Sequence, residues 1–231
     1  DSWFRVLGST TPPVPHGPDA DLIECWGKAV GDKDAADILP GWLRKGAPIG
    51  ILEHIEVADV FPRVVPDDPA SNPLSLYSEL AGWSNYASAE EEPQVVADLL
   101  RAQSDKVHCR FFDDMESLLE YLGVEHVVLT KLALVTKLKA DGSPKYRLIW
   151  DLLRSNVNGT VTLTERIVLP RIQDAVDDAR HLRLCSGEDL EWLVLDVADA
   201  FHNIPMHPSE RRFACGMVNG KFVVFLVSCM G

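Results

Sequence analysis

The residue of this sequence best suited to metal chemistry is an aspartate that directly follows an apolar run. Residues 193–208 read LVLDVADAFHNIPMHP, so Asp196 comes after three apolar side chains and Asp199 follows three positions later. An ionised carboxylate is costly to bury, and Mg²⁺ needs only one or two protein carboxylates. The pattern predicts a buried strand over residues 191–197 that presents Asp196 as a ligand for a divalent metal ion. The alternative is that Asp196 caps the helical turn that follows.

Basic residues flank a predicted hairpin further upstream. Two β-rich runs meet at Asp141-Gly142, a dipeptide that is typical of hairpin turns. Lys137 and Lys139 precede this turn and Arg147 follows it. Lysine offers a point charge and arginine a forked donor, and both suit a triphosphate. The alternative is that these charges only protect the exposed edge of a hairpin.

The elements around these residues indicate an α+β fold in which β-hairpins pack with helices. Ser88 and Glu91 suggest a capping box before a helix that reaches about residue 102. Residues 115–122 have helical spacing, and an amphipathic helix is expected after Pro170. Asn219-Gly220 predicts a second hairpin with a tight turn.

Composition divides the chain into three parts. Residues 1–20 contain four prolines and predict a flexible leader. Residues 21–125 predict an acidic, mostly helical region, with a Pro-rich linker at 62–75. From about residue 126 the character changes to β-rich hairpins, a helix and a strand. The chain begins without Met and ends directly after a strand-like run, which leads us to expect a fragment.

The negative charge is confined to the N-terminal part. Residues 131–231 hold 13 Lys and Arg against 12 Asp and Glu, whereas residues 1–130 hold 9 against 23, which gives the net charge of −13. Phosphate binding requires a local basic patch, and the charge of the whole chain is a poor guide to it. The hairpin around Asp141-Gly142 is therefore still a candidate phosphate-binding element.

Cysteine and histidine patterns give no sign of a disulfide framework or a zinc site. The five cysteines are scattered and form no C-x-x-C pair, which favours a reducing intracellular compartment such as the cytoplasm or nucleus. His202 and His207 are five residues apart, have no Cys partner at helical spacing, and are interpreted as surface histidines. No apolar stretch approaches the ~20 residues of a membrane helix, so we expect no membrane partner.

Four segments, in order, resemble reverse transcriptases of the retrotransposon type. LVLDVADAFHNIPMHP is similar to the first catalytic motif of that family, Asp-x-x-x-Ala-(Phe/Tyr) before a hydrophobic-Pro step. LVTKLKADGSPKYRLIWDLLRSNVN resembles the fingers hairpin, with its basic run, Asp-Gly, Arg and Asp-x-x-x-x-Asn. IVLPRIQDAVDD is similar to the Pro-Leu-Pro-(Arg/Lys)-Ile segment that leads into the palm, and RRFACGMVNGKFVVFLVSCMG to the hairpin that ends in Pro-(Phe/Gln)-Gly. The resemblance covers residues 126–231.

The resemblance implies a metal-binding role for the aspartate motif. Asp196 corresponds to a catalytic aspartate that binds Mg²⁺ or Mn²⁺, with the Val197 backbone carbonyl as a second metal contact. Phe201 corresponds to the residue that excludes a ribose 2′-hydroxyl, which implies a preference for deoxynucleotides, and Asp199 belongs to the same nucleotide-binding turn.

The resemblance also implies how phosphates and template are held. Lys137 or Lys139, together with Arg147, corresponds to the triphosphate-binding group. Met230 and Gly231 stand where the template-positioning Pro-(Phe/Gln)-Gly motif would lie.

The fold and activity expected from this resemblance are those of an RNA-directed DNA polymerase. We expect a partial palm-and-fingers fold over 126–231 that stops before the Asp-Asp motif, preceded by the helical region. The partners would be an RNA or DNA template-primer and a deoxynucleoside triphosphate, and the fragment alone is predicted to be inactive. The alternatives are a degenerate or domesticated retroelement remnant that binds nucleic acid or protein without chemistry, and a protein-interaction role for the acidic region.

Overall fold

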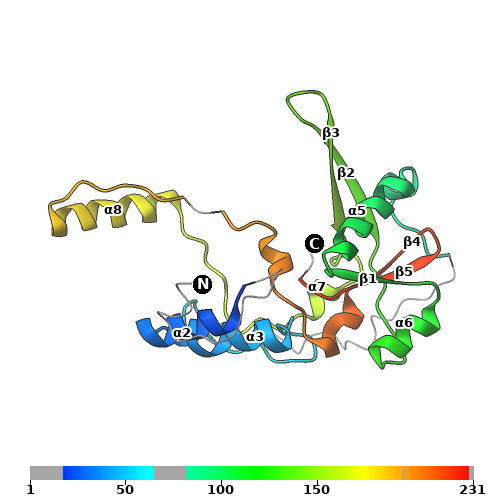
Figure 1. Cartoon of the computed structure of the whole chain (residues 1–231), viewed down its shortest axis with the longest axis horizontal. Coiled ribbons are helices and arrows are strands. Elements are labelled where there is room, and N and C mark those ends of the chain that lie inside the picture. Colours follow the sequence, from blue (N-terminus) through cyan, green and yellow to red (C-terminus); the bar gives the residue numbers. More distant parts are fainter. Residues whose placement is uncertain (1–17, 65–81, 195, 229–231) are drawn as a thin grey trace.

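The computed structural model describes residues 18–64, 82–194 and 196–228, which form a mixed α+β structure with two small antiparallel sheets. Both sheets lie toward one end, a pair of N-terminal helices extends away from them, and one helix stands apart on a long extended excursion (Figure 1). Met230 and Gly231 lie outside the described residues, as do most of the predicted leader and much of the predicted linker. The helical elements are α2 (Ala20–Val30), the π-helical η1 (Asp34–Ile38), α3 (Leu39–Lys45), α4 (Ala87–Glu90), α5 (Pro93–Asp105), α6 (Met115–Leu122), α7 (Val157–Thr160), α8 (Ile172–Ser186) and the 3₁₀ turns η3 (Ala200–Asn203) and η4 (Pro208–Phe213); the strands are β1 (Cys109–Phe112), β2 (Leu132–Leu138), β3 (Pro144–Trp150), β4 (Cys215–Val218) and β5 (Lys221–Phe225).

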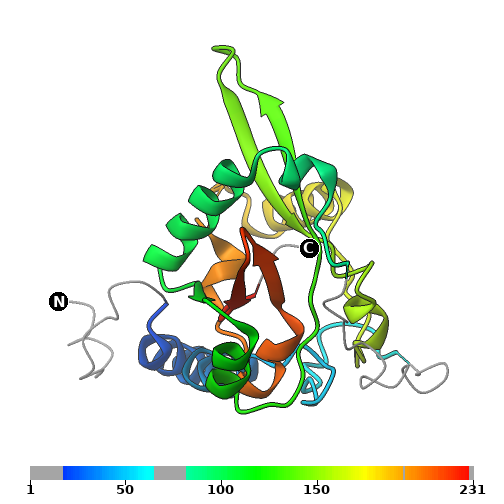
Figure 2. The same cartoon turned by 90° about the vertical axis from the view of Figure 1, so that its right-hand side faces the viewer.

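The first sheet has the strand order β1-β5-β4, and its central strand β5 is packed on both faces. Side chains of β5 alternate between two clusters: Val223 and Phe225 pack with Leu100 of α5, whereas Phe222 and Val224 pack with Leu118 of α6. Figure 2 shows the two helices beside this sheet. This alternation follows from the two-residue period of a strand and makes β5 the centre of the fold.

The turn between β4 and β5 confirms the predicted second hairpin. Asn219 has φ 50° and Gly220 has φ 73°. Two consecutive positive φ angles are what a type I′ turn requires, and Asn-Gly adopts them most readily. The helix predicted over 115–122 is also confirmed as α6, which Asp114 caps and which ends at Gly123 with φ 64°.

The second sheet is the hairpin β2–β3, which projects from the body (Figures 1 and 2). Its base is buried in the core through Leu132, Leu134 and Trp150. At its tip Gly142 has φ 79°, and the Asp141 carboxylate accepts hydrogen bonds from Ser143. The hairpin predicted at Asp141-Gly142 is therefore confirmed.

The helix predicted over 88–102 is interrupted, because Pro93 begins a new helix. Glu92, the residue before it, has φ −125° and ψ 53°, in keeping with the restriction that proline places on its predecessor. The predicted capping box is wrong: the Ser88 hydroxyl accepts a hydrogen bond from the Leu134 backbone N–H, which ties α4 to β2.

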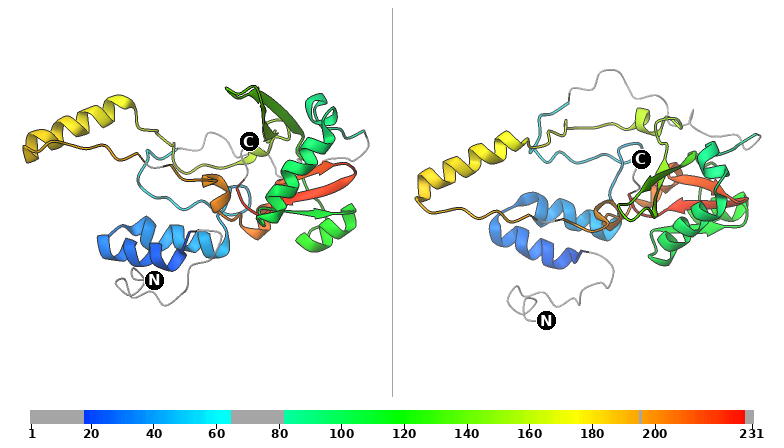
Figure 3. Two further views of the ribbon diagram at one scale, coloured as in Figure 1. Left: turned by 45° about the horizontal axis from the view of Figure 1, so that its top comes forward. Right: turned by 90° about the horizontal axis from the view of Figure 1, so that it is seen from above.

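The predicted buried strand over 191–197 is wrong. The described residues of this stretch are extended without strand pairing, and Leu193 and Val194 are 81% and 88% exposed. A strand needs neighbours for its backbone hydrogen bonds, and the described residues of this stretch pair with neither sheet. Together with α8, which has no buried residue, this stretch forms an arm that leads away from the body in the views of Figure 3.

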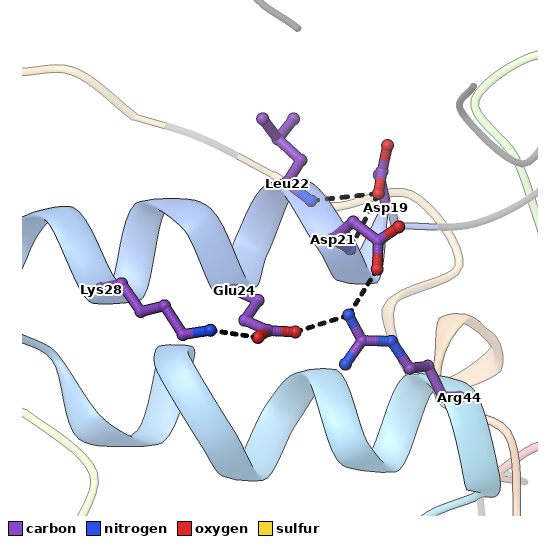
Figure 4. Close-up of polar contacts among 6 residues, drawn as sticks. All are labelled: Asp19, Asp21, Leu22, Glu24, Lys28 and Arg44. Carbon is purple, nitrogen blue, oxygen red and sulfur yellow. Dashed lines mark hydrogen bonds and ion pairs between the residues drawn. The ribbon is translucent and has the colours of Figure 1, made fainter. Parts of the chain in front are cut away.

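The N-terminal helices form a hairpin of their own, joined by charge. Asp19 caps α2 by accepting hydrogen bonds from the N–H groups of Asp21 and Leu22. From α3, Arg44 forms ion pairs with Asp21 and Glu24, as Figure 4 shows. Within the described part of the chain, no helix is long and apolar enough to cross a membrane.

A buried carboxylate attaches the segment after α3 to the rest of the molecule. Glu210 of η4 is fully buried. Its two oxygens accept hydrogen bonds from the backbone N–H groups of Ile49, Ile51, Leu52 and Glu53, with lengths of 2.8 Å for Ile51 and Leu52 and 3.2 Å for Glu53. Hydrogen bonds to an ionised acceptor are about twice as strong as neutral ones, so Glu210 fixes the path of this segment.

Replacing Glu210 with alanine should lower the free energy of unfolding by about 3 kcal/mol, because it leaves several backbone N–H groups without an acceptor. Urea denaturation followed by circular dichroism would measure the change. Glu120→Ala, on the exposed side of α6, is the matched control and should keep the wild-type midpoint. Equal midpoints for the two variants would contradict this role of Glu210.

Candidate nucleotide-binding site

One face of the β2–β3 hairpin is strongly basic. The register places Lys137 directly opposite Lys145, and Arg147 opposite Val135. Cross-strand partners share a face and every second residue returns to it, so Lys137, Lys145 and Arg147 lie on one face. Lys139 continues that face into the turn. All four cations are exposed, and the ion pairs found between described residues do not include them.

This arrangement is unfavourable for the free hairpin. Like charges directly opposite one another destabilise a strand pair, and among the described residues Lys137 and Lys145 form no ion pair that would offset the repulsion. A polyanion bound along this face would relieve that repulsion. The hairpin therefore has the electrostatic character of a phosphate-binding surface.

Arg147 also lines a cavity of about 310 Å³ that includes the turn after Asp196. The cavity lies between α5, β3, η3 and β5. Arg147 and His202, which are far apart in the sequence, both line it. Its full lining is Leu99, Gln103, Tyr146, Arg147, Leu148, Ile149, Trp150, His202 and Phe225. The structure thus joins the predicted basic hairpin to the turn predicted to bind nucleotide.

The turn η3 is fastened to the body by two side chains. The Asp199 carboxylate accepts a hydrogen bond of 2.6 Å from the Lys106 ammonium, at the end of α5. The rings of His202 and His108 are stacked, with centroids 4.9 Å apart and an interplanar angle of 17°. Asp199 itself has φ 51°, a left-handed conformation that starts the 3₁₀ turn. These contacts fix where the residues after Asp196 lie.

The surroundings of both imidazoles disfavour their protonated forms. Burial lowers the pKa of His202, and burial together with the nearby His202 and Lys106 lowers the pKa of His108. The hydrogen bond from Lys106 lowers the pKa of Asp199. The interpretation of His202 as a surface histidine is therefore wrong, because its ring lies between His108 and Phe225.

The other predicted site residues are less closely joined. Asp196 and Val197 are exposed on unpaired extended backbone, and Asp196 makes no hydrogen bond or ion pair with the described residues. Phe201 is 56% exposed and does not line the cavity. Asp199 is engaged by Lys106 and therefore positions the turn.

The described acids do not complete a metal centre. With Asp199 held by Lys106, Asp196 is the one free carboxylate of the motif, and the ranges that the structure describes contain no group of three His, Cys, Asp or Glu side chains suited to a metal ion. Nucleotidyl transfer uses two metal ions, and this donor set does not fit them. The assignment of Mg²⁺ or Mn²⁺ to Asp196 and Val197 stays a prediction.

Sequence reasoning missed several residues of the cluster. Lys145 could have been found, because a turn centred on Asp141-Gly142 pairs it with Lys137. Gln103, Lys106 and His108 carry no sequence signal, since they reach the site only through the packing of α5 and β1 on the sheet.

The base of the hairpin has its own anchor. The Tyr86 hydroxyl donates a short hydrogen bond to the Asp151 carboxylate, which also accepts from the Arg154 backbone N–H at 2.9 Å. The bond from Tyr86 is the main cause of a lowered pKa at Asp151. Asp151 thus fixes the end of β3 and does not line the cavity.

Comparison with models of known protein families and with curated protein sequences gives no match to this chain.

Stability should fall as the pH is lowered from about 7 to 5. The unfolded chain protonates its histidines near pH 6.5, whereas His108 and His202 resist protonation in the folded state, so the unfolded state binds more protons in this window. His202→Phe removes one of the two groups and keeps the ring stack, so its free energy of unfolding should change less with pH. The lowered pKa of Asp199 changes the stability only at lower pH, outside the range from pH 7 to 5.

The matched control for this measurement is His181→Phe, on α8, where no residue is buried. Chemical denaturation at pH 5, 6 and 7 would give the slope of the free energy of unfolding against pH for the wild type and for each of the two variants. The expectation is that His181→Phe follows the wild type; an unchanged slope in His202→Phe would refute the assignment.

Proposed function

We propose that this chain forms the fingers and the N-terminal part of the palm of a retrotransposon-type reverse transcriptase. In the parent reaction a primer 3′-hydroxyl attacks the α-phosphate of a deoxynucleoside triphosphate and releases pyrophosphate. The observation that carries the proposal is the unpaired cationic face of Lys137, Lys139, Lys145 and Arg147 on a projecting hairpin, next to a cavity that it shares with the turn after Asp196.

The contribution of these residues is to bind and orient phosphates. Arg147 supplies a forked donor at the mouth of the cavity, and the lysines supply point charges further along the hairpin. Holding a triphosphate and a template strand in place is a large part of catalysis in phosphoryl transfer. Asp196 is the carboxylate of this chain proposed to bind metal once further ligands join it.

A second candidate is a nucleic-acid-binding module without chemistry. The basic face of the hairpin favours it, because phosphate binding needs cations and no metal-binding carboxylate. The two candidates share the cationic face and differ in whether Asp196 ever takes part in a reaction.

The chain should bind an RNA template annealed to a DNA primer, with an affinity that falls as salt rises. Each phosphate contact contributes roughly 0.7–0.9 to the slope of log K against log salt. The double variant Lys137→Gln/Lys145→Gln should therefore lower this slope by about 1.5. Fluorescence anisotropy with a labelled primer from 50 to 300 mM KCl would measure it.

The matched control carries the same change of charge elsewhere. Lys28 and Lys221 are ion-paired with Glu24 and Asp113, away from the hairpin. Lys28→Gln/Lys221→Gln should keep the wild-type slope. If both double variants bind alike, the hairpin is not the nucleic-acid surface.

This chain by itself should not extend a primer, because Lys106 engages Asp199 and Asp196 alone does not hold the two metal ions that nucleotidyl transfer uses. A primer-extension assay on an RNA template, with Mg²⁺ or Mn²⁺ and all four deoxynucleotides, would test this. Incorporation that disappears in Asp196→Asn would contradict the prediction and establish Asp196 as catalytic.

A further inference from the structure

We infer that a second cavity, between α5 and the turn of the β4–β5 hairpin, binds a small aromatic carboxylate. This turn cavity measures about 280 Å³ and shares no lining residue with the cavity beside Arg147. The inference therefore rests neither on the proposed function nor on a template or a metal ion. The turn cavity is lined by Ala97, Arg101, Phe111, Val218, Asn219 and Lys221.

Strand alternation directs the sheet residues of this lining toward α5. In the strand register Phe111 lies opposite Val223, and Val218 lies opposite Lys221. Val218 and Val223 belong to the core cluster on the α5 side of the sheet. Cross-strand partners share a face, and every second residue of a strand returns to it. The side chains of Phe111, Val218 and Lys221 therefore all lie on the face that α5 covers.

The floor of the turn cavity is apolar. Ala97 of α5 and Val218 of β4 are buried, and the half-buried Phe111 packs against the same core cluster. Aromatic rings prefer edge and offset contacts with one another, so the Phe111 ring favours an aromatic ligand. A volume of about 280 Å³ lies just below the roughly 300 Å³ at which sites for drug-sized ligands begin. The floor therefore suits a ligand with a single ring.

The rim of the turn cavity supplies donors. Arg101, Lys221 and the amide of Asn219 are exposed there, and the described lining contains no acid. Nη1 of Arg101 lies 2.7 Å from the Asp98 carboxylate. Nζ of Lys221 lies 2.7 Å from the Asp113 carboxylate. A guanidinium has five N–H donors and an ammonium three, so both cations keep donors for a ligand.

A ring on the floor with its carboxylate at the rim satisfies both parts of the turn cavity at once. Asp98 and Asp113 compete for the two cations, but ion pairs between exposed side chains are weak. The contact between Arg101 and a ligand carboxylate is charge-assisted, so the neutral amide of the same ligand should bind about five-fold more weakly or worse. Two sources share this chemistry: a free aromatic acid and the C-terminal phenylalanine of a peptide.

A ¹H–¹⁵N NMR titration of the full chain with phenylacetate and with N-acetylphenylalanine, each against its amide, tests the inference. We expect saturable shifts at the backbone amides of Phe111 and of residues 219–221, and the tighter acid identifies the source. Arg101→Gln should weaken that acid by about five-fold or more. Ala97→Leu, which fills the floor and keeps every charge, should weaken it to a similar extent. Asp113→Asn removes the competitor for Lys221 and should strengthen binding, by up to about five-fold.

The matched control is Arg180→Gln, which removes the same charge from the exposed helix α8, outside the turn cavity. It should change the affinity less than about two-fold, because only charges near the ligand act on it strongly. The inference is overturned if neither acid gives saturable shifts, or if the shifts are confined to the β2–β3 hairpin. Equal affinity for acid and amide, or for the wild type and folded Arg101→Gln, would overturn it as well.

Discussion

The packing of Trp150 on Phe225 is the contact on which the candidate site depends. Trp150 ends the hairpin strand β3 and Phe225 ends the central strand β5, so this edge-on pair joins the projecting hairpin to the buried sheet. Gly216 on β4 leaves the room it needs, because a Cβ there would lie 3.0 Å from the indole ring. Without this contact neither the cavity nor the position of Arg147 relative to His202 would be defined.

The acidic and basic side chains lie in different parts of the molecule, the acids on the N-terminal helices and the cations on the β2–β3 hairpin. Acids of the N-terminal helices are partly used internally, as where Arg44 bridges Asp21 and Glu24. The cations of the hairpin have no such partners among the described residues, and Lys137 faces Lys145 across the strands. A protein that tolerates this repulsion on a projecting element has the charge distribution of one that meets polyanions, even though its net charge is negative.

Local signals in the sequence predicted local structure well. Asp141-Gly142 and Asn219-Gly220 defined both hairpins, because a turn that needs positive φ accepts few residues. The apolar run that contains Leu193 and Val194 could not be assessed in the same way, since whether such a run becomes a strand depends on pairing with a sheet elsewhere in the fold, which the sequence does not show. The cavity was equally hidden, because Gln103, Trp150 and His202 meet only through tertiary packing.

The Glu210 carboxylate has a consequence for how the chain acquires its structure during synthesis. Its backbone partners at 49–53 leave the ribosome roughly 160 residues before it does, as the separation of 161 between Ile49 and Glu210 shows. Before then, the described residues that can hold the segment after α3 include Thr162, whose N–H donates to the Gly50 carbonyl, and Glu165, which accepts from the Ala58 N–H. Contacts between such distant positions form slowly, so the attachment of this segment is completed late, when the last part of the chain supplies the Glu210 carboxylate.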